Sequence, residues 1–421
     1  GEITLTVISA GPGSSDWAAR SDHNHDGAYV NAGQADSVTS AMISNGTIQL
    51  ADIGQNGCDG NEILKWTGSA WACAADETGS GGGSYWSLTG NAGTTPGTEF
   101  LGTTDNQALE LHADSARALR LEPNSGTSPN LIGGHSSNSA SGAYGASIGG
   151  GGLSGSANSV SGNLGTIGGG ANVRVTDDYG TVGGGYNNQA GDAAGTSGDS
   201  AYATVGGGAG NHALDAYAVV GGGYYSSAAG QSATVAGGES NNAGGSRATI
   251  GGGYSNTAAN SYATVAGGRQ NNAGGDSAAI GGGQFNYATA GWSTVAGGYD
   301  NTGSASYATV AGGSGNASSA TYATVTGGQG NTAGASWSTI GGGHNLQVTG
   351  ESGTIGGGKN NPVTGTYGFV GGGLFNTAGG FESTIGGGQG NNAGGDGSVV
   401  SGGAVNSAST LLSAIGGGQN N

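Results

Sequence analysis

The chain has 421 residues, of which 100 are glycine, and only 8% are charged, for a formal net charge of −18. Collagen is excluded because it needs glycine at every third position, a spacing that is absent here. The chain offers no basic patch for phosphates and no apolar run long enough to cross a bilayer, so we expect neither a nucleic-acid partner nor membrane insertion.

Residues 1–35 are the first predicted segment, a strand followed by a connector. Near its start, aliphatic residues alternate with polar ones as in a β-strand: Ile3, Leu5 and Val7. The connector contains a histidine pair, His23 and His25, in an aspartate-rich stretch. If three chains meet at an axis, this pair supplies six imidazoles, a set that suits iron or another transition metal. The alternative is two solvated histidines, and no other cofactor is expected.

Residues 36–83 are predicted to form a small module that contains both cysteines, Cys58 and Cys73. The stretch 62–72 between them has the pattern of a strand, a Thr-Gly turn and a second strand. Such a hairpin brings its ends together, so we expect a disulfide, as in exported proteins, rather than two unpaired thiols. The module ends in three glycines, which predict a flexible joint.

Residues 84–130 contain two short segments in which apolar and polar residues alternate, 109–112 and 118–121. Together they predict a β-hairpin that caps the repeats that follow.

Residues 131–421 carry a repeat of fifteen residues. A valine or isoleucine recurs at this interval from Val205 to Ile415, and earlier members are separated by irregular gaps, with the longest insertion at 191–200. Glycines follow each aliphatic residue, and an asparagine stands six places after most of them. Alternation such as Tyr262-Ala263-Thr264-Val265 predicts a strand with Ala263 and Val265 inside, glycine allows tight corners, and stacked asparagines satisfy backbone groups there. The pattern predicts an all-β chain, a parallel β-solenoid of some nineteen coils.

One coil encloses little apolar surface, one valine or isoleucine and about two alanines. Ordering fifteen glycine-rich residues costs more conformational entropy than the burial of these side chains returns. We therefore expect a second surface to be buried against other copies of the chain. Threefold symmetry suits a long rod, so the prediction is a homotrimer.

The sequence stops partway through a coil, at Asn421. An open solenoid edge invites strand addition. We expect that either a C-terminal domain has been removed or another subunit covers this edge. The candidate cover is the N-terminal strand of Ile3, Leu5 and Val7 from the next trimer, which would join trimers head to tail.

Coils of the form Ala-Thr-Val-Gly-Gly-Gly-x-x-Asn-x-Ala-x-Gly resemble the head repeats of trimeric autotransporter adhesins. That resemblance implies a left-handed β-roll with three chains side by side. The segment from His23 to Tyr29 and the Trp-Thr-Gly-Ser-Ala-Trp hairpin at 66–71 are similar to motifs of phage and phage-like tail fibres. In similar fibres the histidine motif binds metal.

An aromatic residue often stands three places before the repeating aliphatic one. The members of this column are Tyr202, Tyr217, Tyr262, Trp292, Tyr307, Tyr322, Trp337 and Tyr367. Such a stripe packs against a neighbouring chain or stacks on a glycan, and both alternatives stay open.

The interpretation that joins these observations is an extracellular trimeric fibre, structural or adhesive, on a cell surface or on a virion or phage-like particle. Its expected partners are further copies of itself and a surface glycan or host-cell receptor. The alternative is a self-polymerising filament, with a glycan depolymerase and an ice-binding protein as weaker candidates. No enzymatic activity is expected, because neither lysine belongs to a phosphate-binding motif, the histidines are scattered and carboxylates are sparse in the repeats.

Overall fold

The computed structural model describes residues 58, 62–75, 86–87, 89–194 and 196–421. They belong to two units, Gly1–Leu101 and Gly102–Asn421, which are described separately. Throughout the described residues the regular elements are β-strands, and none is a helix. The prediction of an all-β chain is confirmed. The histidine pair at 23 and 25 and the strand of Ile3, Leu5 and Val7 lie outside the described residues, and the roles given to them stay predictions.

The first unit contains an antiparallel hairpin of β1 (Glu62–Trp66) and β2 (Trp71–Ala75), in which Trp66 pairs with Trp71. Its turn is closed by a hydrogen bond from the Thr67 amide to the Ala70 carbonyl, and Gly68 takes the left-handed φ of 94° that this turn needs. The hairpin places Cys73 beside Cys58, and the two form a disulfide with their Cα atoms 5.2 Å apart. The predicted hairpin and disulfide are confirmed.

This disulfide predicts that the purified, unreduced protein has no thiol that reacts with iodoacetamide under denaturing conditions. Its intact mass should be two hydrogens lower than that of the reduced chain, because one S–S bond replaces two S–H bonds. Mass spectrometry before and after reduction measures both quantities. Two alkylated cysteines in the unreduced sample would contradict the assignment.

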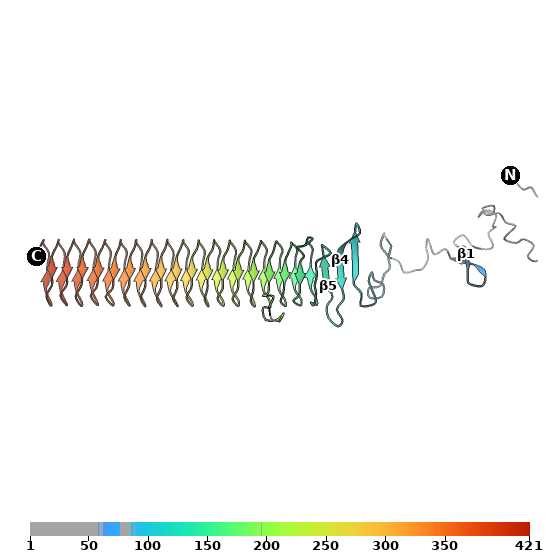
Figure 1. Cartoon of the computed structure of the whole chain (residues 1–421), viewed down its shortest axis with the longest axis horizontal. Coiled ribbons are helices and arrows are strands. Elements are labelled where there is room, and N and C mark those ends of the chain that lie inside the picture. Colours follow the sequence, from blue (N-terminus) through green and yellow to red (C-terminus); the bar gives the residue numbers. More distant parts are fainter. Residues whose placement is uncertain (1–57, 59–61, 76–85, 88, 195) are drawn as a thin grey trace, which may run out of the picture. The chain divides into compact units, whose positions relative to one another are not determined.

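The second unit begins with a hairpin that covers the first coil of the solenoid. Strand β3 (Leu109–Ala113) pairs antiparallel with β4 (Ala116–Glu122), and β4 pairs antiparallel with β5 (Asn130–Gly133). From β5 onward every further strand pairing in the solenoid is parallel, as Figure 1 shows for the stack of arrows. The hairpin expected at 84–130 therefore lies on the end of the repeat stack.

Each coil contributes one short strand to a first parallel sheet, and β5 to β40 give nineteen strands in this sheet, all of two residues except the four-residue β5. After β5 they are β6 (Ser147–Ile148), β8 (Thr166–Ile167), β10 (Thr181–Val182), β12 (Thr204–Val205), β14 (Val219–Val220), β16 (Thr234–Val235), β18 (Thr249–Ile250), β20 (Thr264–Val265), β22 (Ala279–Ile280), β24 (Thr294–Val295), β26 (Thr309–Val310), β28 (Thr324–Val325), β30 (Thr339–Ile340), β32 (Thr354–Ile355), β34 (Phe369–Val370), β36 (Thr384–Ile385), β38 (Val399–Val400) and β40 (Ala414–Ile415).

A second parallel sheet runs alongside the first and has seventeen strands of two residues each. They are β7 (Ser159–Val160), β9 (Arg174–Val175), β11 (Gln189–Ala190), β13 (His212–Ala213), β15 (Ser227–Ala228), β17 (Asn242–Ala243), β19 (Thr257–Ala258), β21 (Asn272–Ala273), β23 (Tyr287–Ala288), β25 (Thr302–Gly303), β27 (Ala317–Ser318), β29 (Thr332–Ala333), β31 (Gln347–Val348), β33 (Pro362–Val363), β35 (Thr377–Ala378), β37 (Asn392–Ala393) and β39 (Ser407–Ala408). The predicted solenoid of fifteen-residue coils is confirmed.

The core is a narrow column between the two sheets. In one coil it receives Ala263 and Val265 from the first sheet side and Asn271 and Ala273 from the second, all fully buried or nearly so. The buried aliphatic of each coil sits directly on that of the next, as in the pairing of Val265 with Ile280. The interior of most coils therefore holds one branched aliphatic side chain, as the repeat predicts, and a few coils bury a second one from the second sheet, such as Val348 and Val363.

Buried asparagines form a hydrogen-bonded ladder next to this column. The side chain of Asn316 accepts a hydrogen bond from the Asn331 amide at 3.0 Å and donates to the carbonyls of Gly312 and Gly328 at 2.8 and 2.9 Å. One side chain thus satisfies three backbone groups at a corner where the chain is not in a strand. The predicted asparagine ladder is confirmed.

The strands are shorter than the alternation suggests. Tyr262 does not belong to the strand that holds Thr264 and Val265, because it lies in a turn with a left-handed φ of 60°. The turn is needed because a fifteen-residue coil must change direction several times within one layer. The expectation of a strand that starts at the aromatic residue is wrong, although that residue does point outward. The left-handed sense of the roll stays a prediction.

Candidate functional site

The outward surface of the solenoid carries a column of aromatic residues at one corner. All eight predicted members occupy the same turn position, with φ between 56° and 66°. The left-handed region costs an L-residue roughly 1 kcal/mol or more. In other coils this position holds Ser232, Arg247, Ser277 or Glu382. The turn therefore does not require an aromatic side chain, and the recurrence of rings points to a role on the surface.

The rings stack along the rod in two runs. In the first, Tyr179, Tyr202 and Tyr217 follow one another at centroid distances of 4.7 and 5.1 Å, with ring planes within 5° of parallel. The second run has four rings at 5.1, 4.8 and 6.0 Å, and its members are Trp292, Tyr307, Tyr322 and Trp337. The spacing follows from the distance between neighbouring strands, about 4.8 Å. We call Tyr179 and the eight predicted residues the aromatic ladder.

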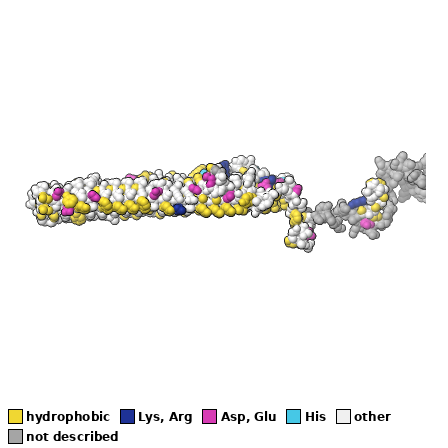
Figure 2. Space-filling model, turned by 90° about the horizontal axis from the view of Figure 1, so that it is seen from below, with side chains coloured by type: hydrophobic (Ala, Val, Ile, Leu, Met, Phe, Trp, Pro, Cys, Tyr) yellow, Lys and Arg dark blue, Asp and Glu magenta, His cyan; other side chains and the backbone are white. Residues whose placement is uncertain are grey.

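The aromatic ladder is exposed in the single chain. The eight predicted residues keep between 42% and 57% of their surface accessible. Figure 2 shows hydrophobic side chains in long rows along one edge of the solenoid. The charged side chain of Arg247 lies between the two runs. Its Cζ atom is 5.3 Å from the ring centroid of Tyr262, and its guanidinium donates a hydrogen bond to the Tyr262 hydroxyl. Exposed rows of stacked rings of this kind mark an interaction site.

The alternation missed one ladder residue and a second aromatic surface. Tyr179 escapes the fifteen-residue count because the insertion at 191–200 separates it from the regular repeats. The second surface lies four and five places after the aliphatic residue, where Phe285 meets Tyr299 edge to face at 5.8 Å. In the same columns the ring centroids of Tyr224 and Tyr225 lie 4.3 Å apart. The charge of the neighbouring Tyr225 is the main cause that raises the pKa of Tyr224. The spacing of these columns was visible in the sequence, but polar residues interrupt the first column, and polar residues and glycines interrupt the second.

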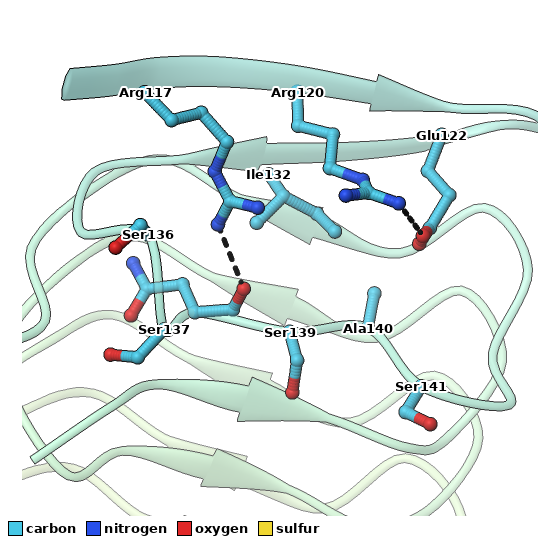
Figure 3. A pocket seen from close by; sticks show the side chains of 10 residues that line it. Arg117, Arg120, Glu122, Ile132, Ser136, Ser137, Ser139, Ala140 and Ser141 are labelled. Atoms are coloured by element: carbon cyan, nitrogen blue, oxygen red, sulfur yellow. Dashed lines mark hydrogen bonds and ion pairs between the residues drawn. The ribbon is translucent and has the colours of Figure 1, made fainter. Parts of the chain in front are cut away.

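A small cavity lies where β4 meets the loop after β5. Figure 3 shows Arg117 and Arg120 extending from β4 toward that loop, and the cavity measures about 290 Å³. Arg117 donates a hydrogen bond to the Asn138 carbonyl at 3.0 Å. Arg120 contacts both Glu110 and Glu122, at 3.2 and 2.9 Å.

The arginines that line this cavity are paired with carboxylates of the hairpin. His112 lies 3.2 Å from Glu110 and is the main cause that lowers the pKa of that carboxyl. Arg120 and Arg117 act on Glu110 in the same direction. Arg117 thus attaches the hairpin to the first coil, and Arg120 and His112 neutralise acidic groups of the hairpin, a structural use of charge.

No family model matches this chain, and no curated protein matches it. Within the part of the chain that the structure describes, no helix is long and apolar enough to cross a membrane. The fold is a β-solenoid of about nineteen turns, compatible with a β-roll of the kind found in fibre-like proteins.

Proposed function

We propose that the protein is an extracellular fibre with a structural or adhesive role, in which three copies pack side by side along the aromatic ladder. The observation that carries this proposal is the ladder itself. Its rings are not needed for the turn that holds them, yet they recur along most of the rod and remain exposed in the single chain. A long solenoid with such an edge is typical of fibrous proteins.

A second copy of the chain is the partner that fits the ladder best. A surface that covers rings spaced about 5 Å apart over many coils must repeat with the same rise. Parallel copies of this chain have that rise by construction, so their ladders stay in register along the whole rod. Only two of the ladder's neighbours in the same column are charged, Arg247 and Glu382, so little desolvation opposes the contact.

The thin core supports the same partner. Most coils bury one branched aliphatic residue and two small ones, whereas the ladder leaves the largest side chains of the solenoid half exposed. Burial of every further 100 Å² of apolar surface contributes about 2.5 kcal/mol. Packing between chains would therefore add apolar burial to that of the interior at each coil that carries a ring.

The disulfide supports an exported location, because such bonds persist in oxidising compartments. The proposed setting is a cell surface, a virion or a phage-like particle. The proposal assigns the chain no reaction. Contact with a surface glycan or a host-cell receptor would use aromatic positions that the neighbouring chains leave free, such as Tyr254 and Tyr299.

The proposal predicts a mass in solution of three times the 39.7 kDa chain mass, measured by sedimentation equilibrium on the full chain. The double variant Tyr307→Glu, Tyr322→Glu should shift this mass toward that of one chain, because six carboxylates would meet at the packed edge. Glutamate suits the turn itself, since Glu382 occupies the same position in another coil with φ of 54°.

The matched control places two glutamates in a different column, Ser314→Glu and Gln329→Glu. That column naturally holds Glu239 and runs parallel to the ladder. The control should keep the threefold mass. A wild-type mass of one chain would contradict the trimer, and a ladder variant that stays as trimeric as the control would remove the ladder as the packing surface. In that case the rings would be free to stack on a glycan.

A further inference from the structure

The longest insertion in the solenoid forms a loop on one side of the rod. The buried residues Val182 and Val205 pair as neighbours although 23 residues separate them instead of fifteen. The loop connects β11 to β12, and the regular register is restored on both sides of it. Figure 1 shows it extending from the stack of coils. An insertion that leaves the coils unchanged has no structural need to be there.

The loop closes over a buried aspartate of the preceding coil. Asp177 is 1% exposed, and its Oδ2 accepts hydrogen bonds from the Thr176 hydroxyl at 3.0 Å and from the Asp192 amide at 3.1 Å. Its Oδ1 is buried as well and accepts no hydrogen bond. A buried carboxylate oxygen without a partner is costly, and such a group calls for a ligand.

The loop brings two more carboxylates to the same point. One oxygen each of Asp177, Asp192 and Asp199 lies within 4.8 Å of the other two. Among the ion pairs formed by the described residues, none involves these three groups. Burial raises the pKa of Asp177, and the neighbouring Asp199 raises it further against the opposing Thr176 hydroxyl. Three acidic groups thus converge without a compensating positive charge.

The backbone of the loop is shaped around Asp177. Gly191 begins the loop with a left-handed φ of 97°, and a Cβ atom there would overlap the Asp177 carboxylate and the Thr176 hydroxyl. Farther along, the Asp178 amide donates to the Ser197 carbonyl at 2.5 Å. An adjoining cavity of about 280 Å³ is lined by further oxygen-bearing residues, among them Ser161, Thr176 and Thr196. The loop therefore surrounds the acidic cluster and does not merely pass it.

We propose that Asp177, Asp192 and Asp199 bind one Ca²⁺ ion, which fastens the inserted loop to the solenoid. Ca²⁺ takes oxygen ligands at about 2.3–2.6 Å, so two of its ligands lie at most about 5 Å apart, as these carboxylates do. The cluster offers oxygen and neither nitrogen nor sulfur, which excludes the ligand set of zinc or copper. The irregular loop and adjoining hydroxyl groups suit the flexible coordination of Ca²⁺ better than the strict octahedron of Mg²⁺.

The test uses the full chain, stripped with EGTA and dialysed, and titrated with CaCl₂ by calorimetry. We expect one site per chain, with a dissociation constant on the order of 10⁻⁴–10⁻³ M, the range of extracellular calcium modules. Asp199→Asn should weaken it at least tenfold. Limited proteolysis supplies a second readout, because Ca²⁺ should protect the loop at 191–200 in the wild type and not in this variant.

The control is Asp215→Asn. It removes a carboxylate from the position that Asp192 occupies one coil earlier, and Asp215 lies outside the cluster. It should bind calcium as the wild type does. No heat of binding up to 10 mM CaCl₂, on the order of ten times the weakest expected constant, would overturn the proposal. Equal weakening by Asp215→Asn would also overturn it, and equal protection of the loop by MgCl₂ would overturn the choice of calcium.

Discussion

Replacing Val310 with aspartate should open the solenoid at its own coil. Val310 is fully buried and lies between Val295 and Val325 of the neighbouring coils. An aspartate there places a carboxylate directly between two valine side chains, with no cationic side chain among the described buried residues. A buried charge without a partner destabilises a protein by about 4 kcal/mol or more. Since each coil contacts only its neighbours, the effect should be local.

Hydrogen exchange measured by mass spectrometry on the full chain tests this. Peptides that cover residues 295–325 should lose protection in Val310→Asp, while peptides near residue 250 should keep it. Thr309→Asp is the matched control, because Thr309 is next in sequence, in the same strand, and is only half-buried. It should exchange like the wild type. Equal loss of protection in both variants would mean that the threonine side is also buried, in that case between chains.

The period alone was enough to predict the fold of this chain. An aliphatic residue every fifteen places fixes which side chains share the interior, and no other arrangement satisfies that register over so many coils. The asparagine ladder followed from the same count, because a buried amide must be satisfied at every step. The disulfide followed from the hairpin between Cys58 and Cys73.

The corners could not be predicted in the same way. Alternation places Tyr262 in a strand, whereas the structure places it in a turn, because the pattern of side chains does not report φ for residues other than glycine and asparagine. The acidic cluster was missed for a different reason. Asp177 and Asp199 are 22 residues apart and meet only because an inserted loop folds back on the preceding coil. Because the insertion at 191–200 interrupts the fifteen-residue repeat, the sequence does not show which residues of the loop lie beside which residues of the preceding coil.

Two adjacent glycines should respond oppositely to the same substitution. Gly313 has a left-handed φ of 90°, and a Cβ atom there would overlap the Gly328 carbonyl oxygen and lie 2.5 Å from the Asn316 Nδ2. These two atoms are hydrogen-bonded to each other at 2.9 Å in the asparagine ladder. Gly312 has no atom within 4 Å of the corresponding Cβ position, and its φ lies outside the left-handed region.

Gly313→Ala should therefore destabilise its coil by on the order of 4 kcal/mol, the sum of backbone strain, overlap and a broken ladder bond. Gly312→Ala should be neutral or stabilising by up to about 1 kcal/mol, because alanine restricts the unfolded chain. Hydrogen exchange of the Asn316 and Asn331 backbone amides measures the effect of both substitutions, because these amides donate hydrogen bonds to side chains of the asparagine ladder. If Gly312→Ala opened these amides as much as Gly313→Ala does, the space beside Gly312 would have to be filled by something outside the single chain. The natural occupant would then be a neighbouring copy, packed at this corner as well as along the aromatic ladder.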